Sequence, residues 1–190
     1  MVLRRLEAHW CLIIAASVLT TACIPSLTGA SPTWPLDPMP AGSEADADAR
    51  IACSKSFESA GEPIELVVAD RRSQGLVASY YRGSTYSLLV VVREQDDVAP
   101  TCELSLGGSS PIVEGSAAVV TASARWRDGW ALAGAVEPGV DAVVVGLDQG
   151  QVRAALSRGY FVAFWPMPAP ATSIAAWRDG SALPVETIAH

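Results

Sequence analysis

Apolar and polar residues alternate most regularly between positions 140 and 166 of this chain. Every second residue is apolar in two successive segments, first at Val143, Val145 and Leu147 and then at Val152, Ala154 and Leu156. A period of two is typical of a β-strand that buries one face and leaves the other to solvent. The next segment, residues 160–165, is apolar on both faces, which predicts a strand covered on both sides by other layers. We therefore predict three consecutive antiparallel strands in the middle of a sandwich or barrel.

Two tight turns separate these predicted strands. Asp148-Gln149-Gly150 and Arg158-Gly159 supply them, since glycine adopts a positive φ angle without steric cost. The polar step Asp70-Arg71-Arg72 ends an earlier apolar segment. Further strands are predicted by the same reasoning at residues 64–69, 75–81, 85–93, 101–106, 116–126, 130–136, 173–177 and 182–188. The predicted fold class is therefore mainly β, an antiparallel β-sandwich or a partly open barrel.

One N-terminal helix is predicted before the strands, from Ser43 to about residue 56. Ser43 is a favourable N-cap, and Asp46 lies in the first turn, where a negative charge interacts well with the helix dipole. In this position the helix carries Cys53 toward the sheet. The predicted organisation is a single β-rich domain over residues 46–190.

The first residues of the chain have the order of an export signal. Arg4 and Arg5 precede an apolar run over residues 10–22, which is shorter than the roughly 20 apolar residues that a membrane-spanning helix needs. The sequence Leu19-Thr20-Thr21-Ala22-Cys23 resembles a bacterial lipobox, although Thr20 stands where leucine is usual. We predict that residues 1–22 are a lipoprotein-type signal peptide and that Cys23 carries the lipid. Ordinary cleavage after Ala30, which gives a secreted protein, and an uncleaved anchor are the alternatives.

Residues 23–45 are rich in proline, glycine, serine and alanine. Prolines favour extended backbone and donate no ladder hydrogen bonds, so this segment is predicted to be a tether. With Cys23 acylated, the tether holds the folded domain on the extracytoplasmic face of the cytoplasmic membrane.

The chain contains four cysteines, of which Cys11 lies in the predicted signal and Cys23 is the predicted lipid site. Cys53 and Cys102 remain. Exported proteins fold in oxidising surroundings, so we predict one disulfide between these two residues. The loop-entropy model assigns about 4 kcal/mol of stabilisation to a loop of this size.

Charge and residue types exclude several functions. The formal net charge is −7, and no cluster of basic residues is present, which argues against nucleic acid as a ligand. Beyond the predicted signal, His190 is the only histidine, and a terminal residue is a poor catalytic base. We expect no metal site, no cofactor and no catalytic residue. A hydrolase that uses carboxylates alone, with Asp96 and Asp97 as the adjacent acids, is the enzymatic alternative.

A seven-residue segment occurs twice, as WRDGWAL at residues 126–132 and as WRDGSAL at residues 177–183, with six positions identical. The favoured interpretation is a pair of hairpin turns, each with a tryptophan that covers the sheet. The alternative is an aromatic patch of Trp126, Trp130 and Trp177 that binds a glycan or a partner protein.

Three features together resemble uncharacterised exported proteins of actinobacteria. These are the sequence LVVADRR at residues 66–72, the cysteines Cys53 and Cys102, and the sequence GYFVAFWP at residues 159–166. The resemblance implies a β-domain of the cell envelope and assigns no catalytic residue.

These observations predict a membrane-anchored envelope lipoprotein with a non-enzymatic binding domain. Its expected partners are the cytoplasmic membrane, through the lipid, and an envelope protein or a cell-wall component. A secreted sensor of small ligands is a further alternative, with an apolar pocket near Phe161, Phe164 and Trp165.

Overall fold

A computed structural model describes residues 39–40, 43–72, 75–93, 100–106, 116–126, 129–184 and 186–187. The predicted signal peptide, Cys23 and residues 24–38 of the predicted tether lie outside the described residues. Within that tether, Met39 and Pro40 form a short strand that pairs with residues 70 and 71.

The strands form three antiparallel sheets. The first sheet has the order β1-β2-β3-β4-β5, the second β10-β11-β7-β6, and the third β13-β12-β8-β9, with β14 also paired to β12. In the first sheet the strands are β1 (Met39–Pro40), β2 (Glu65–Arg72), β3 (Leu76–Arg82), β4 (Tyr86–Arg93) and β5 (Thr101–Leu106). In the second they are β6 (Ala118–Trp126), β7 (Gly129–Val136), β10 (Ala155–Ser157) and β11 (Tyr160–Trp165). In the third they are β8 (Ala142–Leu147), β9 (Gly150–Arg153), β12 (Ser173–Arg178), β13 (Ser181–Ala182) and β14 (Glu186–Thr187).

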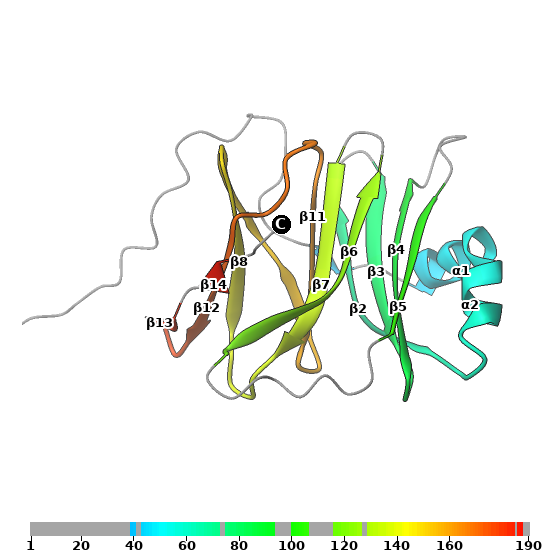
Figure 1. Ribbon diagram of the computed structural model, residues 1–190, viewed down its shortest axis with the longest axis horizontal. Coiled ribbons are helices and arrows are strands. Elements are labelled where there is room, and N and C mark those ends of the chain that lie inside the picture. Colours follow the sequence, from blue (N-terminus) through cyan, green and yellow to red (C-terminus); the bar gives the residue numbers. More distant parts are fainter. Residues whose placement is uncertain are drawn as a thin grey trace, which may run out of the picture.

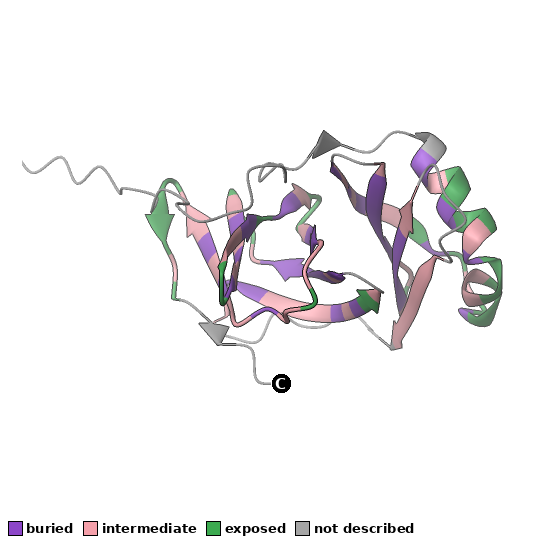
Figure 2. Ribbon diagram, turned by 90° about the horizontal axis from the view of Figure 1, so that it is seen from above, coloured by how far each residue is buried: buried purple, intermediate pink, exposed green. Residues whose placement is uncertain are grey.

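The sheets and two short helices, α1 (Ser43–Ala52) and α2 (Ser54–Ser59), are stacked in layers (Figure 1). A hydrophobic core of buried residues lies between each pair of neighbouring layers, which gives three cores among the described residues (Figure 2). The helical core, between the helices and the first sheet, contains Ala49, Cys53, Ala60, Ile64, Tyr81, Leu88 and Val90. The first inter-sheet core joins the first and second sheets and includes Val68, Tyr80, Leu89, Ala133, Val162 and Phe164. The second inter-sheet core joins the second and third sheets and includes Leu132, Val143, Val145, Phe161, Trp165 and Ile174.

The predicted fold class is confirmed, because the described chain is mainly β and all its strand pairs are antiparallel. One prediction needs refinement, since the single N-terminal helix is divided into α1 and α2 at Cys53. The alternation at Val143, Val145 and Leu147 is confirmed, and all three side chains are buried.

The three consecutive strands predicted over residues 140–166 are in fact four, divided between two sheets. β8 and β9 belong to the third sheet, whereas β10 and β11 belong to the second. The chain crosses between these layers at Ala154, which packs in the second inter-sheet core, while the next residue, Ala155, packs in the first. Val152, Ala154 and Leu156 keep the predicted period of two, because all three pack in the second inter-sheet core. Ala155, which lies between the last two, is buried on the other face, in the first inter-sheet core. The predicted turn at Arg158 and Gly159 is confirmed, with φ angles of 53° and 80°.

The polar step at residues 70–72 is not a break between strands. β2 continues through it to Arg72, and the side chains of Asp70 and Arg72 are both fully buried. A β-bulge between Leu66 and Val68 reverses the facing of the rest of β2. Leu66 therefore faces the helical core, whereas Val68, Asp70 and Arg72 face the second sheet.

Candidate functional site

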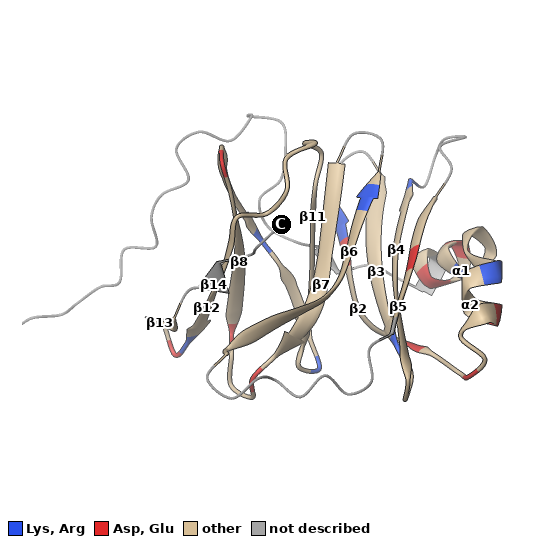
Figure 3. Ribbon diagram, in the orientation of Figure 1, with Lys and Arg blue, Asp and Glu red and all other residues tan. Residues whose placement is uncertain are grey.

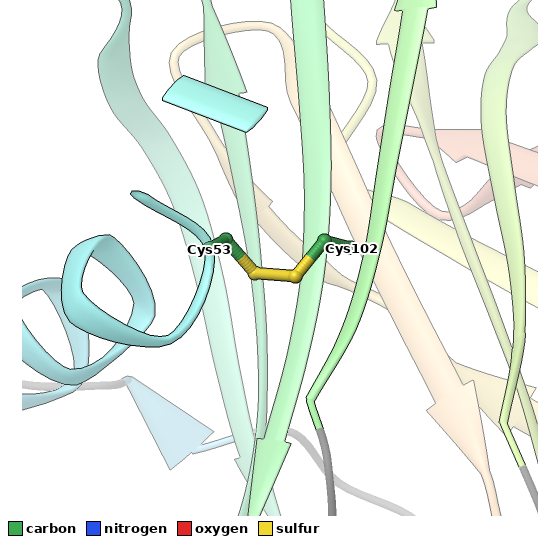
Figure 4. Close-up of a disulfide and its surroundings, with 2 residues drawn as sticks. All are labelled: Cys53 and Cys102. Atoms are coloured by element: carbon green, nitrogen blue, oxygen red, sulfur yellow. A yellow bond between two sulfur atoms is a disulfide. The ribbon is translucent and has the colours of Figure 1, made fainter. Parts of the chain in front are cut away.

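The predicted disulfide is present between Cys53 and Cys102, with the two Cα atoms 5.9 Å apart (Figure 4). Cys53 lies at the junction of the two helices and is buried, whereas Cys102 lies on β5, at an edge of the first sheet. The bond therefore ties the helical layer to the first sheet.

The three tryptophans predicted as a patch lie on different faces. Trp126 packs in the first inter-sheet core, and its ring centroid lies 6.1 Å from that of Phe164. Its indole also covers Gly129, where an added Cβ would lie only 2.2 Å from a ring carbon. Trp130 packs on the opposite face, in the second inter-sheet core, with the guanidinium of Arg125 6.0 Å from its centroid.

Trp177 differs from both, because it packs in none of the three cores of the described residues. Its neighbours Ile174 and Ala176 on β12 face the second inter-sheet core. Since side chains alternate along a strand, Trp177 faces away from that core, on the outer face of the third sheet. The structure thus does not assemble the predicted three-tryptophan patch, and it leaves Trp177 as an outward-facing aromatic residue.

The strand register shows how this outer face is arranged. Its residues form three cross-strand rows, namely Gln151, Gly146 and Ser173, then Arg153, Val144 and Ala175, and finally Ala142, Trp177 and Ala182. The side chains that surround Trp177 are small and apolar, while the far row offers an amide and a hydroxyl group. Arg153 is the charged residue among these nine, and Figure 3 shows the central stretches of β8 and β12 without charge. We define these nine residues as the outer face.

The two copies of the repeated segment place their first tryptophans, Trp126 and Trp177, differently, because the two hairpins differ in strand register. Both copies lie in hairpins, but the first pairs Trp126 with Gly129, whereas the second pairs Arg178 with Ser181. Asp179 and Gly180 form the second turn, with φ angles of 50° and 72°. The two copies therefore differ in register by one residue, and nearly identical sequences do not produce equivalent tryptophan positions.

Asp70 and Arg72 form a buried ion pair. Arg72 donates from Nε to Asp70 Oδ2 at 2.8 Å, and its Nη2 donates to the carbonyl oxygen of Arg153. The same guanidinium lies 5.6 Å from the centroid of the Phe164 ring. This buried ion pair therefore links the first sheet to the place where the chain crosses from the third sheet to the second.

The pKa values of two glutamates are shifted in opposite directions. Glu62 accepts hydrogen bonds from the Ser84 hydroxyl and from the backbone N–H groups of Thr85 and Tyr86, and the Ser84 bond contributes most to lowering the pKa of Glu62. Burial raises the pKa of Glu103, against the opposing effect of a hydrogen bond from the Ser123 backbone N–H. Glu62 therefore fixes the β3–β4 turn, and Glu103 joins β5 to the edge strand β6.

No group of three or more His, Cys, Asp or Glu side chains within the described ranges is placed to hold a metal ion. The acids Asp96 and Asp97, named for the hydrolase alternative, lie outside the described residues. The pocket expected near Phe161, Phe164 and Trp165 is not formed by these side chains facing one another. All three are fully buried, and Phe164 faces the first inter-sheet core while the other two face the second.

Comparison of the chain with protein-family models, with curated proteins and with solved structures gives no match. Among the described helices, none has the length and apolar character needed to cross a bilayer. The outer face around Trp177 is the candidate site.

Proposed function

We propose that this protein is a lipid-anchored domain of the cell envelope that binds a macromolecular partner through the outer face of the third sheet. The position of Trp177 carries the proposal, because this large aromatic side chain contributes to no core of the described chain. Tryptophan is enriched among the residues that dominate binding energy at protein interfaces. A role in binding is the simplest account of its placement.

The surroundings of Trp177 support the same role. Alanines at 142, 175 and 182 lie beside it, so its nearest neighbours in the described strand register are small. A ligand that stacks on the indole then reaches Ser173 and Gln151 at the other end of the same face. Apolar contact flanked by hydrogen-bonding groups is the usual composition of a recognition surface.

The Cys53–Cys102 disulfide supports the location outside the cytoplasm, since such bonds persist mainly in oxidising compartments. In the proposal, acylated Cys23 fixes the chain to the cytoplasmic membrane, and the tether separates the domain from the lipid surface. The partner is a wall component or another envelope protein. Binding is proposed in place of catalysis because Asp70, Glu62 and Glu103 all serve structural contacts.

Site-specific photo-crosslinking of the full-length protein in intact cells tests this proposal. A photoreactive amino acid at Ala175 should give a defined cross-linked product, either to wall glycan or to one envelope protein. Digestion with a wall-degrading enzyme or with a protease distinguishes the two partners. The Trp177→Ala substitution should reduce the yield at least tenfold.

Ile51 provides the control, because it is 77% exposed on α1, at the helical side of the molecule (Figure 1). The same photoreactive group at Ile51 should give no such product, and Ile51→Ala should leave the Ala175 product unchanged. Equal yields from Ala175 and Ile51, or an Ala175 product that survives Trp177→Ala, would contradict binding at the outer face.

A further inference from the structure

The helical layer contributes little apolar surface of its own to the fold. We call residues 43–60, which comprise α1, Cys53 and α2, the helical cover. Its buried residues are Ala45, Ala49, Cys53 and Ala60, all of them small, and α2 itself contains none. Hydrophobic stabilisation scales with the apolar area removed from water, so these alanines hold the cover only weakly.

The sheet face beneath the cover is very different. Tyr81, Leu88 and Val90 are fully buried there, and Leu66, Tyr86 and Leu104 pack around them. This face of the first sheet therefore carries large aromatic and branched side chains that depend on the helical cover for their burial.

Polar and aromatic contacts of Arg50 and Phe57 also hold the cover. Arg50 donates from Nη2 to the Ile64 carbonyl oxygen at 3.2 Å, and its guanidinium lies 5.4 Å from the Tyr81 ring centroid. Phe57 meets Tyr81 edge to face, with centroids 4.9 Å apart. Arg50 is exposed and Phe57 is partly exposed, so solvent competes with these contacts. Apart from the polypeptide chain itself, which runs from the cover into β2, the disulfide is the one covalent link between the cover and the first sheet among the described residues.

We propose that the Cys53–Cys102 disulfide is a redox-sensitive lock, and that its reduction releases the helical cover while the three sheets remain folded. Both inter-sheet cores are built without any residue of the cover. They also contain no cysteine, so their packing does not depend on the bond. Local opening of one weakly packed unit, with the rest intact, is the expected behaviour of such an arrangement.

The reductant is a protein dithiol of the thiol–disulfide exchange class. Its first thiolate attacks Sγ of Cys102, because Cys102 is partly exposed whereas Cys53 is buried. A mixed disulfide forms, and Cys53 leaves as a thiolate that takes up a proton. The second thiolate of the reductant then attacks the sulfur of the reductant's first cysteine in the mixed disulfide. Cys102 is released as a thiolate and takes up a proton. Two electrons pass to the cysteine pair, and the reductant leaves as a disulfide.

Release of the cover changes what the protein presents to its surroundings. The face around Tyr81, Leu88 and Val90 becomes accessible, next to the edge strand β5. An exposed apolar face of this kind binds apolar fluorescent dyes. The lock is independent of the proposed binding at the outer face, which lies on the opposite side of the stack (Figure 1).

Amide hydrogen exchange of the full chain, read by mass spectrometry before and after reduction of the folded protein, tests the lock. Alkylation and peptide mapping establish that Cys53 and Cys102 have been reduced. We expect exchange in residues 43–60 to accelerate at least tenfold, while β7 and β11 keep their protection. Binding of an apolar fluorescent dye should rise at the same time. The Cys53→Ser/Cys102→Ser double variant should reproduce the reduced state.

Two results would overturn the proposal. If residues 43–60 keep their protection after reduction, contacts other than the disulfide hold the cover. If β7 and β11 lose protection together with the helices, the bond supports the whole fold and is not a local lock. Reduction of the folded wild-type protein gives this answer even where the double variant fails to fold.

Discussion

Two glutamates show how position alone reverses the effect of a carboxylate on stability. The pKa of Glu103 is raised by burial, so the folded state binds its proton more tightly than the unfolded chain does. Stability then falls as pH rises from the ordinary carboxyl pKa to the raised value. Glu62 behaves oppositely, since its lowered pKa makes its contribution present above the ordinary pKa and lost as pH falls through the lowered one.

We predict that Glu103→Gln removes the first of these slopes and leaves the protein at least as stable as wild type at pH 7. Glu62→Gln should remove the second slope and lower stability at pH 7, because an amide oxygen is a weaker acceptor for Ser84 and the turn N–H groups. Urea unfolding between pH 3 and 8 measures both variants. A loss of stability at pH 7 in Glu103→Gln that matches the loss in Glu62→Gln would contradict the assigned environments.

Single residues also explain why the candidate site was only partly predictable. The alternation of apolar residues located the strands, and elimination of Cys11 and Cys23 identified the disulfide. The facing of Trp126 depends on a bulge between Val120 and Ala122, which moves the later part of β6 to the first inter-sheet core. Nothing in the apolar pattern indicates that extra residue, so the sequence suggests a shared patch for Trp126 and Trp130 although they lie on opposite faces.

At the level of elements, the crossing from β9 to β10 connects two layers and is supported from a third. Arg72 on β2 donates to the carbonyl oxygen of Arg153, just before Ala154. A bulge again matters, because it turns Asp70 and Arg72 into the inter-sheet core. From the sequence, residues 70–72 are predicted to be a polar step. The apolar pattern does not reveal that Asp70 and Arg72 face the same core and form an ion pair there.

We predict that Arg72→Leu destabilises the fold by about 3–5 kcal/mol, because it removes the guanidinium that forms an ion pair with the buried Asp70 carboxylate. The double replacement Asp70→Leu/Arg72→Met should recover most of that loss, since apolar residues of similar volume often replace a buried ion pair without cost. Chemical denaturation gives both values. A double variant as unstable as Arg72→Leu would show that the pair itself is required.

At the scale of the whole molecule, the layers differ in how many of their faces are covered by other layers. The second sheet lies between two others, which explains why β11 is apolar on both faces, as the sequence predicted. The third sheet has one side in a core and one side around Trp177, and the helical cover closes the other end of the stack (Figure 1). The layer count was not predictable, because alternation reports that a face is covered and not which sheet covers it.

We propose that this chain is exported, is anchored through Cys23 and carries its disulfide-linked stack of sheets outside the cytoplasm. Intact-mass analysis of the mature protein from the membrane fraction tests it most directly, with Cys23→Ser as the control. We expect a chain that begins at acylated Cys23 and is two hydrogens lighter than its reduced form, and we expect Cys23→Ser to lack the lipid. An unprocessed chain in the cytosol, with the thiols of Cys53 and Cys102 both titratable, would contradict it.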